Sequence, residues 1–168
     1  MKKNIIIIAM IAALALLLCA CGAKEEGFSE RDLGLEIGDE TYYLRTDSAP
    51  VIAALGDDYE YSEMVSCVYD GQDKTFAYPG LTVNTVPVEG KDIIEMFTLT
   101  DGTYATLRGC RVGDSREAVI AAYGEEYFDD GYINYTLTND PADIQAERIQ
   151  FEMNGDTVSA IYIYSPSY

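Results

Sequence analysis

The chain has 168 residues, with 29 acidic and 11 basic side chains, no histidine and a formal net charge of −18. This length is enough for one domain of ordinary size with a substantial core. The strong negative charge argues against nucleic acid as a partner, because phosphate binding needs clustered lysine and arginine. The absence of histidine excludes Ser-His-Asp and Cys-His catalysis and removes the commonest metal ligand.

Residues 1–20 have the three parts of a secretory signal peptide: two early lysines, an apolar stretch over residues 5–18 and a small residue before the cleavage point. The end of this segment resembles the lipobox of bacterial lipoproteins, formed here by Leu18, Cys19, Ala20, Cys21 and Gly22. The resemblance implies cleavage after Ala20 and a diacylglyceryl group on the thiol of Cys21, which becomes the first residue of the mature protein. Two acyl chains on one residue give a durable anchor in the cell membrane, facing outside the cytoplasm. An uncleaved membrane-spanning segment is the alternative, because about 20 apolar residues can span a bilayer.

Cleavage would remove two lysines and no acidic residue, so the formal charge would become −20 over residues 21–168. Residues 21–34 are polar and charged, and we expect a flexible stalk there, followed by one compact domain over residues 35–168. Two thiols remain in that domain, at Cys67 and Cys110, and without histidine they do not make a zinc site. A location outside the cytoplasm favours a disulfide between them, and two separate buried thiols are the alternative.

The mature chain contains an internal repeat. Residues 51–56 (VIAALG) recur as residues 119–124 (VIAAYG), and an apolar-Gly-Asp triplet precedes each copy. The repeat predicts an α+β fold with a first unit over residues 35–110 and a second over residues 111–168. Each unit is expected to be a short helix followed by an antiparallel β-meander, and the two units are expected to share one sheet.

The second unit shows the expected elements more clearly. Asp114 or Ser115 can cap a helix that ends at Gly124, and apolar alternation predicts strands over residues 132–137, 148–153 and 157–164. In the first unit the expected strands are residues 61–69, 75–78, 93–99 and 103–108. Gly102 is expected to form the turn between the last two of these strands, as Gly155 does in the second unit.

This pattern over Leu35 to Tyr164 resembles the tandem helix-plus-sheet units of the beta-lactamase inhibitory protein. It is also similar to the single unit of the small lipoprotein of the outer-membrane barrel-assembly machinery. In those families the sheet or its loops form a protein-binding surface, and no catalysis is known. Their partner-contacting residues have no match in this sequence, so the resemblance names no partner.

The sequence therefore favours a lipid-anchored protein-binding or inhibitory module of unknown partner, without catalytic residues, metal or cofactor. Tyrosine is enriched at interfaces, and the candidate binding surface consists of Tyr59, Tyr61, Tyr69, Tyr162 and Tyr164. Ordinary packing in strands would equally explain these residues. The expected partners are the membrane, through the lipid on Cys21, and an unidentified protein.

Three alternatives remain. A cell-envelope hydrolase would use paired carboxylates, taken from Asp57, Asp58, Glu60, Glu63, Asp129 and Asp130. Calcium could bind at residues 70–73 or 129–131, although neither segment has the spacing of an EF-hand loop and both are typical of β-turns. A small-molecule receptor is the third alternative, but the chain is too short for the two lobes of a solute-binding lipoprotein.

Overall fold

The computed structural model describes residues 27–166, so the predicted signal peptide and the predicted lipidation site Cys21 lie outside the described residues. The fold is α+β, which confirms the predicted class. In chain order the elements are the 3-10 helix η1 (Glu30–Asp32), β1 (Gly34–Ile37), β2 (Glu40–Tyr43), α2 (Ala49–Leu55), β3 (Glu60–Val65), β4 (Gln72–Tyr78), β5 (Leu81–Val88), β6 (Lys91–Leu99), α3 (Arg116–Tyr123), β7 (Phe128–Asp129), β8 (Tyr132–Thr136), β9 (Arg148–Asn154) and β10 (Thr157–Tyr164).

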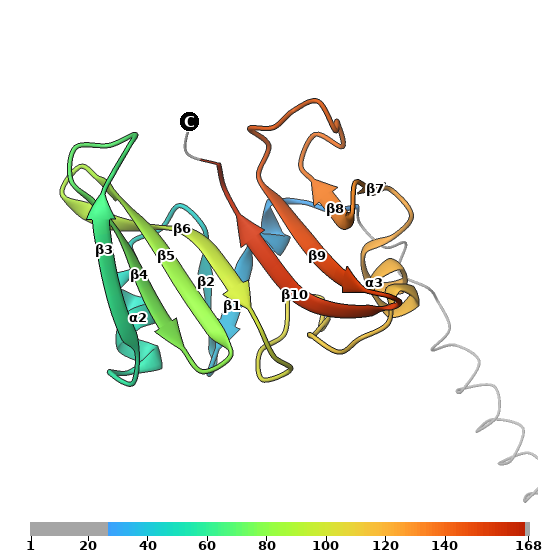
Figure 1. The fold of residues 1–168 in the computed structure, drawn as a ribbon, viewed down its shortest axis with the longest axis horizontal. Coiled ribbons are helices and arrows are strands. Elements are labelled where there is room, and N and C mark those ends of the chain that lie inside the picture. Colours follow the sequence, from blue (N-terminus) through green and yellow to red (C-terminus); the bar gives the residue numbers. More distant parts are fainter. Residues whose placement is uncertain (1–26, 167–168) are drawn as a thin grey trace, which may run out of the picture.

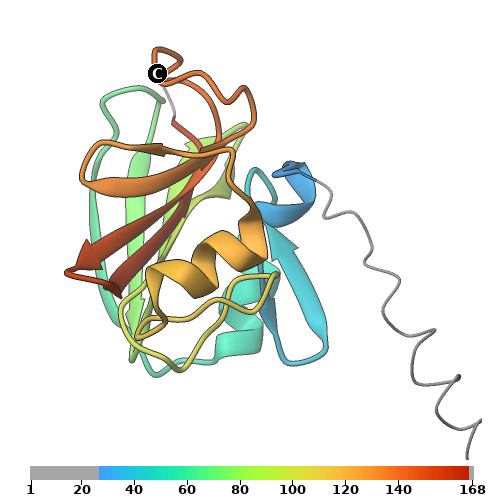
Figure 2. The same ribbon diagram turned by 90° about the vertical axis from the view of Figure 1, so that its right-hand side faces the viewer.

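Eight of the strands form one antiparallel sheet in the order β3-β4-β5-β6-β10-β9-β8-β7 (Figure 1). Strands β1 and β2 form a separate two-stranded sheet, and Leu35 of β1 also makes an isolated β-bridge with Thr106. Figures 1 and 2 show α2, α3 and the β1–β2 hairpin on one side of the large sheet. The other side of the large sheet carries no helix, and we call it the open face.

The core lies between the large sheet and the helices. Because side chains alternate between the two faces of a strand, the register places two apolar rows toward the helices. The first row contains Tyr61, Phe76, Val83, Phe97, Ile163, Ile149 and Tyr135, and the second contains Tyr78, Leu81, Leu99, Ile161, Phe151 and Ile133. All of these side chains except Tyr61 and Phe76 are buried. The buried side chains pack with Leu35, Val51 and Val119 in a single cluster.

The helices begin and end where their local chemistry requires it. Ser115 caps α3, because its hydroxyl accepts a hydrogen bond from the Ala118 amide at 3.2 Å. Gly124 ends α3 with a φ of 89°, and Gly56 ends α2 with a φ of 83°, a region that favours glycine. A helix of two turns is not stable alone, and both helices are joined to the sheet. The hydroxyl of Tyr135 donates to the Gly124 carbonyl at 2.8 Å, and the hydroxyl of Tyr78 donates to the Gly56 carbonyl at 3.2 Å.

Several of the expected strands differ from those observed. Residues 103–108 form a loop, because β5 and β10 already occupy both edges of β6 and leave no pairing position beside it. Gly102 therefore lies in a loop and forms no hairpin turn between strands, so the predicted match with Gly155 is wrong. The strand predicted over residues 61–69 ends at Val65, and β5 was not predicted.

The packed domain begins earlier than the predicted start at residue 35. Phe28 packs against the core, Leu33 is buried, and Gly34 already belongs to β1. Asp32 joins this segment to the rest of the domain through Arg108, whose Nε donates to the Asp32 carboxylate at 2.7 Å. The predicted stalk, residues 21–34, is therefore too long at its C-terminal end.

Candidate functional site

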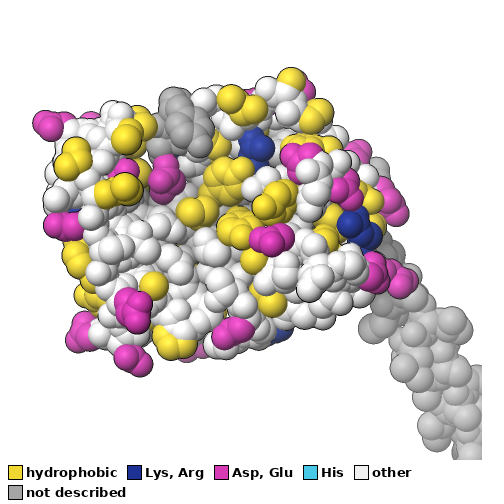
Figure 3. All heavy atoms as spheres, viewed as in Figure 1, with side chains coloured by type: hydrophobic (Ala, Val, Ile, Leu, Met, Phe, Trp, Pro, Cys, Tyr) yellow, Lys and Arg dark blue, Asp and Glu magenta, His cyan; other side chains and the backbone are white. Residues whose placement is uncertain are grey.

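The open face carries two rows of side chains that run across the large sheet in register. The first row contains Ser62, Thr75, Asn84, Met96, Tyr164, Arg148 and Thr136, and the second contains Glu60, Ala77, Thr82, Thr98, Tyr162, Gln150 and Asn134. Neither row contains leucine, isoleucine, valine or phenylalanine, in contrast to the two core rows. Most of these side chains are partly or fully exposed. The open face is therefore a polar and aromatic surface, and Figure 3 views it directly.

Three tyrosines lie on the β8–β9–β10 half of the open face: Tyr132, Tyr162 and Tyr164, which we call the tyrosine cluster. The rings of Tyr132 and Tyr162 are 6.2 Å apart in an edge-to-face arrangement. The guanidinium of Arg148 lies 5.6 Å from the centre of the Tyr164 ring, a cation–π contact. Arg148 itself is held by the β8–β9 loop, because it donates to the carbonyls of Ala146 and Asp143 at 2.9 and 2.8 Å.

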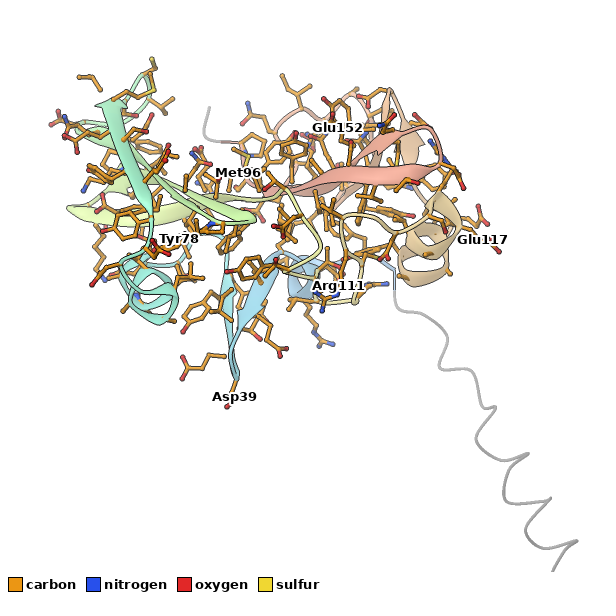
Figure 4. The ribbon with its side chains drawn as sticks, turned by 60° about the horizontal axis from the view of Figure 1, so that its bottom comes forward. Asp39, Tyr78, Met96, Arg111, Glu117 and Glu152 are labelled. Carbon is orange, nitrogen blue, oxygen red and sulfur yellow. The ribbon has the colours of Figure 1, made fainter. Side chains whose placement is uncertain are left out.

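The Tyr162 hydroxyl is fixed by Glu152, to which it donates a hydrogen bond at 2.7 Å. This bond, together with partial burial, raises the pKa of Tyr162 to about 12. The hydroxyl therefore remains protonated at neutral pH. Figure 4 shows Glu152 and Met96 on the same side of the sheet, with Tyr78 directed toward α2 on the other side.

A second polar contact series orders the surface beside the tyrosine cluster. Gln150 donates to the side-chain oxygen of Asn134, and Asn134 donates to Asp130 at 2.8 Å. Asn134 is fully buried although it is polar, so these bonds satisfy groups that water cannot reach. Because these side chains are already fixed, binding on this half of the open face would cost little conformational entropy of the domain.

The β3–β6 half of the open face has smaller polar side chains and is hollowed. Two neighbouring hollows of about 380 and 350 Å³ share the residues Asp73, Glu95 and Met96 in their walls. Strand β3 forms the outer edge of this half, and all six of its residues are exposed. An edge strand offers unpaired backbone groups to another chain.

The structure separates the five tyrosines that were predicted to form one surface. Tyr162 and Tyr164 lie together on the open face. Tyr59 packs against Phe76 and Tyr78 on the helix side. Tyr61 is exposed at the β3 end of the first core row, and Tyr69 lies in the β3–β4 loop. The sequence reasoning did not select Tyr132, although its position at the start of an expected strand, in phase with Gln150 and Glu152, was a usable signal.

The acidic residues proposed for catalysis are also separated. Two of them, Asp57 and Asp58, precede β3, and Glu60 and Glu63 lie within it. Asp129 ends β7 and Asp130 follows it, at the opposite edge of the large sheet. Asp129 binds Arg116 at 2.9 Å and the Gly131 amide at 3.1 Å, as an Asx turn does. Of the predicted calcium segment at residues 70–73, residues 70 and 71 lie in the β3–β4 loop, and residues 72 and 73 already belong to β4. Within residues 27–166, no three histidine, cysteine or carboxylate side chains are grouped closely enough to hold a metal ion.

The two cysteines of the domain are free thiols, so the predicted disulfide is not formed. Cys67 is exposed and lines the 350 Å³ hollow on the open face. Cys110 is buried in the core, on the helix side of the sheet. Burial raises the pKa of the Cys110 thiol to about 11. Spacing in the sequence could not show that the two thiols lie on different sides of the large sheet.

Among the described helices, none is long and apolar enough to cross a membrane. Comparisons with protein-family models, with curated proteins and with solved structures find no match to this chain. The site itself is therefore the basis for a functional interpretation.

Proposed function

We propose that the chain is a lipid-anchored module, displayed outside the cytoplasm, that binds or inhibits a protein partner through the open face. The observation that carries this proposal is the pair of in-register rows on the uncovered side of the large sheet. They present an ordered tyrosine cluster beside a hollowed polar surface. Tyrosines with fixed rings bring contact area at low entropic cost.

The anchor belongs to the same proposal. The lipobox residues Leu18 to Gly22 and the apolar stretch before them support lipidation at Cys21. The described domain begins near Phe28, only a few residues after Cys21, so the lipid would hold the domain close to the bilayer. The formal charge of −20 over residues 21–168 disfavours adsorption of the domain onto anionic headgroups, which leaves the open face available to a protein.

We also propose that the domain arose from two tandem repeats that share the large sheet. The strand order is symmetric about the β6–β10 pair, with four strands from each half of the chain. After each helix the sequence continues with glycine, two acidic residues and tyrosine, at 56–59 and 124–127. In both places a tyrosine hydroxyl from the sheet donates to the glycine carbonyl. These three features support the proposed duplication, and the resemblance of the sequence pattern to the tandem units of the beta-lactamase inhibitory protein remains part of the proposal.

Lipidation is tested by mass spectrometry of the purified wild-type chain and its Cys21→Ala variant. We expect a diacylglyceryl group on the N-terminal residue of the wild-type protein and no lipid on the variant. An unlipidated wild-type chain of full length would contradict the anchor.

Partner binding is tested by photo-crosslinking in the native membrane. A photoreactive residue replaces Thr98, which lies opposite Tyr162 in the middle of the open face, and in a matched control it replaces the exposed Glu36 of β1. We expect a discrete protein adduct from position 98 and none from position 36. Equal labelling from both positions, or none from position 98, would contradict binding through this face.

A further inference from the structure

The hollows on the β3–β6 half of the open face form one groove with an apolar and acidic wall. The 350 Å³ hollow is lined by the apolar side chains Val68, Val86, Met96, Tyr164 and Pro166, together with the carboxylates of Asp73 and Glu95. No lysine or arginine lines it. In the neighbouring hollow the single cation is Lys74, whose ammonium group already binds Asp92 at 2.7 Å.

Asp73 supplies an independent sign of a missing partner. Its Oδ1 atom is inaccessible to solvent, and no described residue donates a hydrogen bond to it. A buried polar group without a partner costs free energy, and an uncompensated charge costs more. Because this oxygen is closed to solvent, the partly buried Asp73 carboxylate must rotate before a cationic donor in the groove can bind it and remove this cost.

The wall also indicates what kind of cation fits. A hydrated metal ion would leave the apolar side chains unused, whereas lysine and arginine carry an alkyl stem below their charge. Two carboxylates beside apolar walls match such a side chain in both charge and polarity. The overall charge of −18 would in addition attract basic segments toward the domain.

The groove continues to the exposed edge of β3, where Ser62 and Met64 form part of its wall. An extended peptide can add to such an edge by pairing with its backbone, which a small polyamine cannot do. We propose that the groove binds a lysine or arginine side chain of an extended basic segment of the partner protein. This inference rests on the proposed function, because it specifies the chemistry of that partner.

The test uses the full-length chain in detergent micelles and a short fluorescent peptide of alternating lysine and serine. Acetylation of the peptide lysines keeps the stems and removes the charge, so we expect it to abolish binding. The Asp73→Asn/Glu95→Gln variant should bind the unmodified peptide at least about tenfold more weakly. The matched control, Glu36→Gln/Glu117→Gln, removes the same charge from exposed positions outside the groove and should change affinity less than about threefold at physiological ionic strength.

Three results would overturn the proposal: equal losses in both double variants, equal binding of the acetylated peptide, or displacement of the peptide by spermidine at matched charge concentration. The last result would assign the groove to a free polyamine. Urea unfolding checks that the variants fold, and Asp73→Asn should not lower stability, since the Oδ1 atom of Asp73 accepts no hydrogen bond that the substitution could break.

The outcome is separable from that of the proposed function. A crosslink from position 98 that persists in the Asp73→Asn/Glu95→Gln variant would disprove the basic segment and retain the binding face. Groove-specific peptide binding without any crosslink in the membrane would retain the preference of the groove for basic side chains and would contradict the binding of a protein partner in the membrane.

Discussion

Arg108 joins separate parts of the fold outside the apolar core. Its guanidinium makes two hydrogen bonds to Asp32, at 2.7 and 2.9 Å, and one to the Ala122 carbonyl of α3 at 3.1 Å. It also lies 5.0 Å from the centre of the Tyr123 ring. The side chains of Arg108 and Asp32 are only 18% and 7% exposed. One ion pair thus joins η1, the loop before α3 and α3 itself.

Asp32→Asn should lower the free energy of unfolding by about 3 kcal/mol, because it removes the carboxylate charge to which the largely buried Arg108 guanidinium makes two hydrogen bonds. Urea denaturation measures the loss. The control is Asp129→Asn, which breaks the more exposed Arg116–Asp129 pair, 32% and 43% exposed, and should cost at most about 1 kcal/mol. Equal costs at the two sites would contradict the structural role given to Arg108.

The two free thiols should differ sharply in reactivity. The thiolate is the reactive form of cysteine, and burial raises the pKa of Cys110 to about 11, whereas Cys67 is exposed. We expect iodoacetamide to modify Cys67 of the folded chain at least about tenfold faster than Cys110, with peptide mass mapping as the measurement. Protection of both residues until reduction would show that a disulfide forms after all.

At the scale of the elements, the sequence predicted helices and strands correctly where a local pattern was compatible with one kind of element. The strand over 157–164 and the helix ending at Gly124 agree with the structure, because alternation and helix caps are local signals. The strand over 103–108 failed for a non-local reason: its alternation is real, but β10 occupies the edge of β6 beside which it would have to pair.

Other features depended on information that a single segment does not carry. β5 was missed because Pro87 interrupts its pattern, although Pro79-Gly80 before it is a recognisable hairpin turn. The candidate surface was predicted only in part, since tyrosine suits both faces of a strand. Only the register assigns Tyr162 to the open face and Tyr61 to the other one.

The two helix-to-sheet contacts give a prediction at this scale. Tyr78→Phe and Tyr135→Phe each remove a hydrogen bond to a helix-ending glycine carbonyl, and each should cost about 1 kcal/mol of unfolding free energy. Because the two contacts lie in different halves of the sheet, the losses should add within about 0.5 kcal/mol. Urea denaturation of the single and double variants measures this, with Tyr43→Phe at an exposed site as the unaffected control. A large loss at one site and none at the other would argue against equivalent units.

At the scale of the whole molecule, stability and surface chemistry are assigned to different faces of one sheet. The core rows contain most of the buried apolar side chains of the large sheet, whereas the open face contains polar and aromatic side chains that are mostly only partly buried. Substitutions on the open face should therefore change binding without unfolding the domain. This separation makes the crosslinking and groove variants informative.

Tyrosine also sets the response of the whole domain to alkaline pH. Burial raises the pKa of Tyr78 to about 12 and also raises the pKa values of Tyr123 and Tyr135, by more. For Tyr162 the hydrogen bond to Glu152 is the largest cause of the raised pKa. An unfolded tyrosine has a pKa of about 10, so the folded state binds more protons above that pH. Stability is therefore complete below about pH 10 and falls as the pH rises toward 12.

We expect the urea midpoint to be constant between about pH 8 and 9 and to decline steeply from about pH 10. Absorbance at the wavelength of tyrosinate should show the buried tyrosines Tyr123 and Tyr135 ionising only as the domain unfolds. Tyr135→Phe removes one buried phenol, so its stability should fall less steeply with pH than that of the wild type, while Tyr43→Phe should follow the wild type. A midpoint that stays constant up to pH 12, or identical slopes in the two variants, would mean that the hydroxyls of the core are not held neutral by burial.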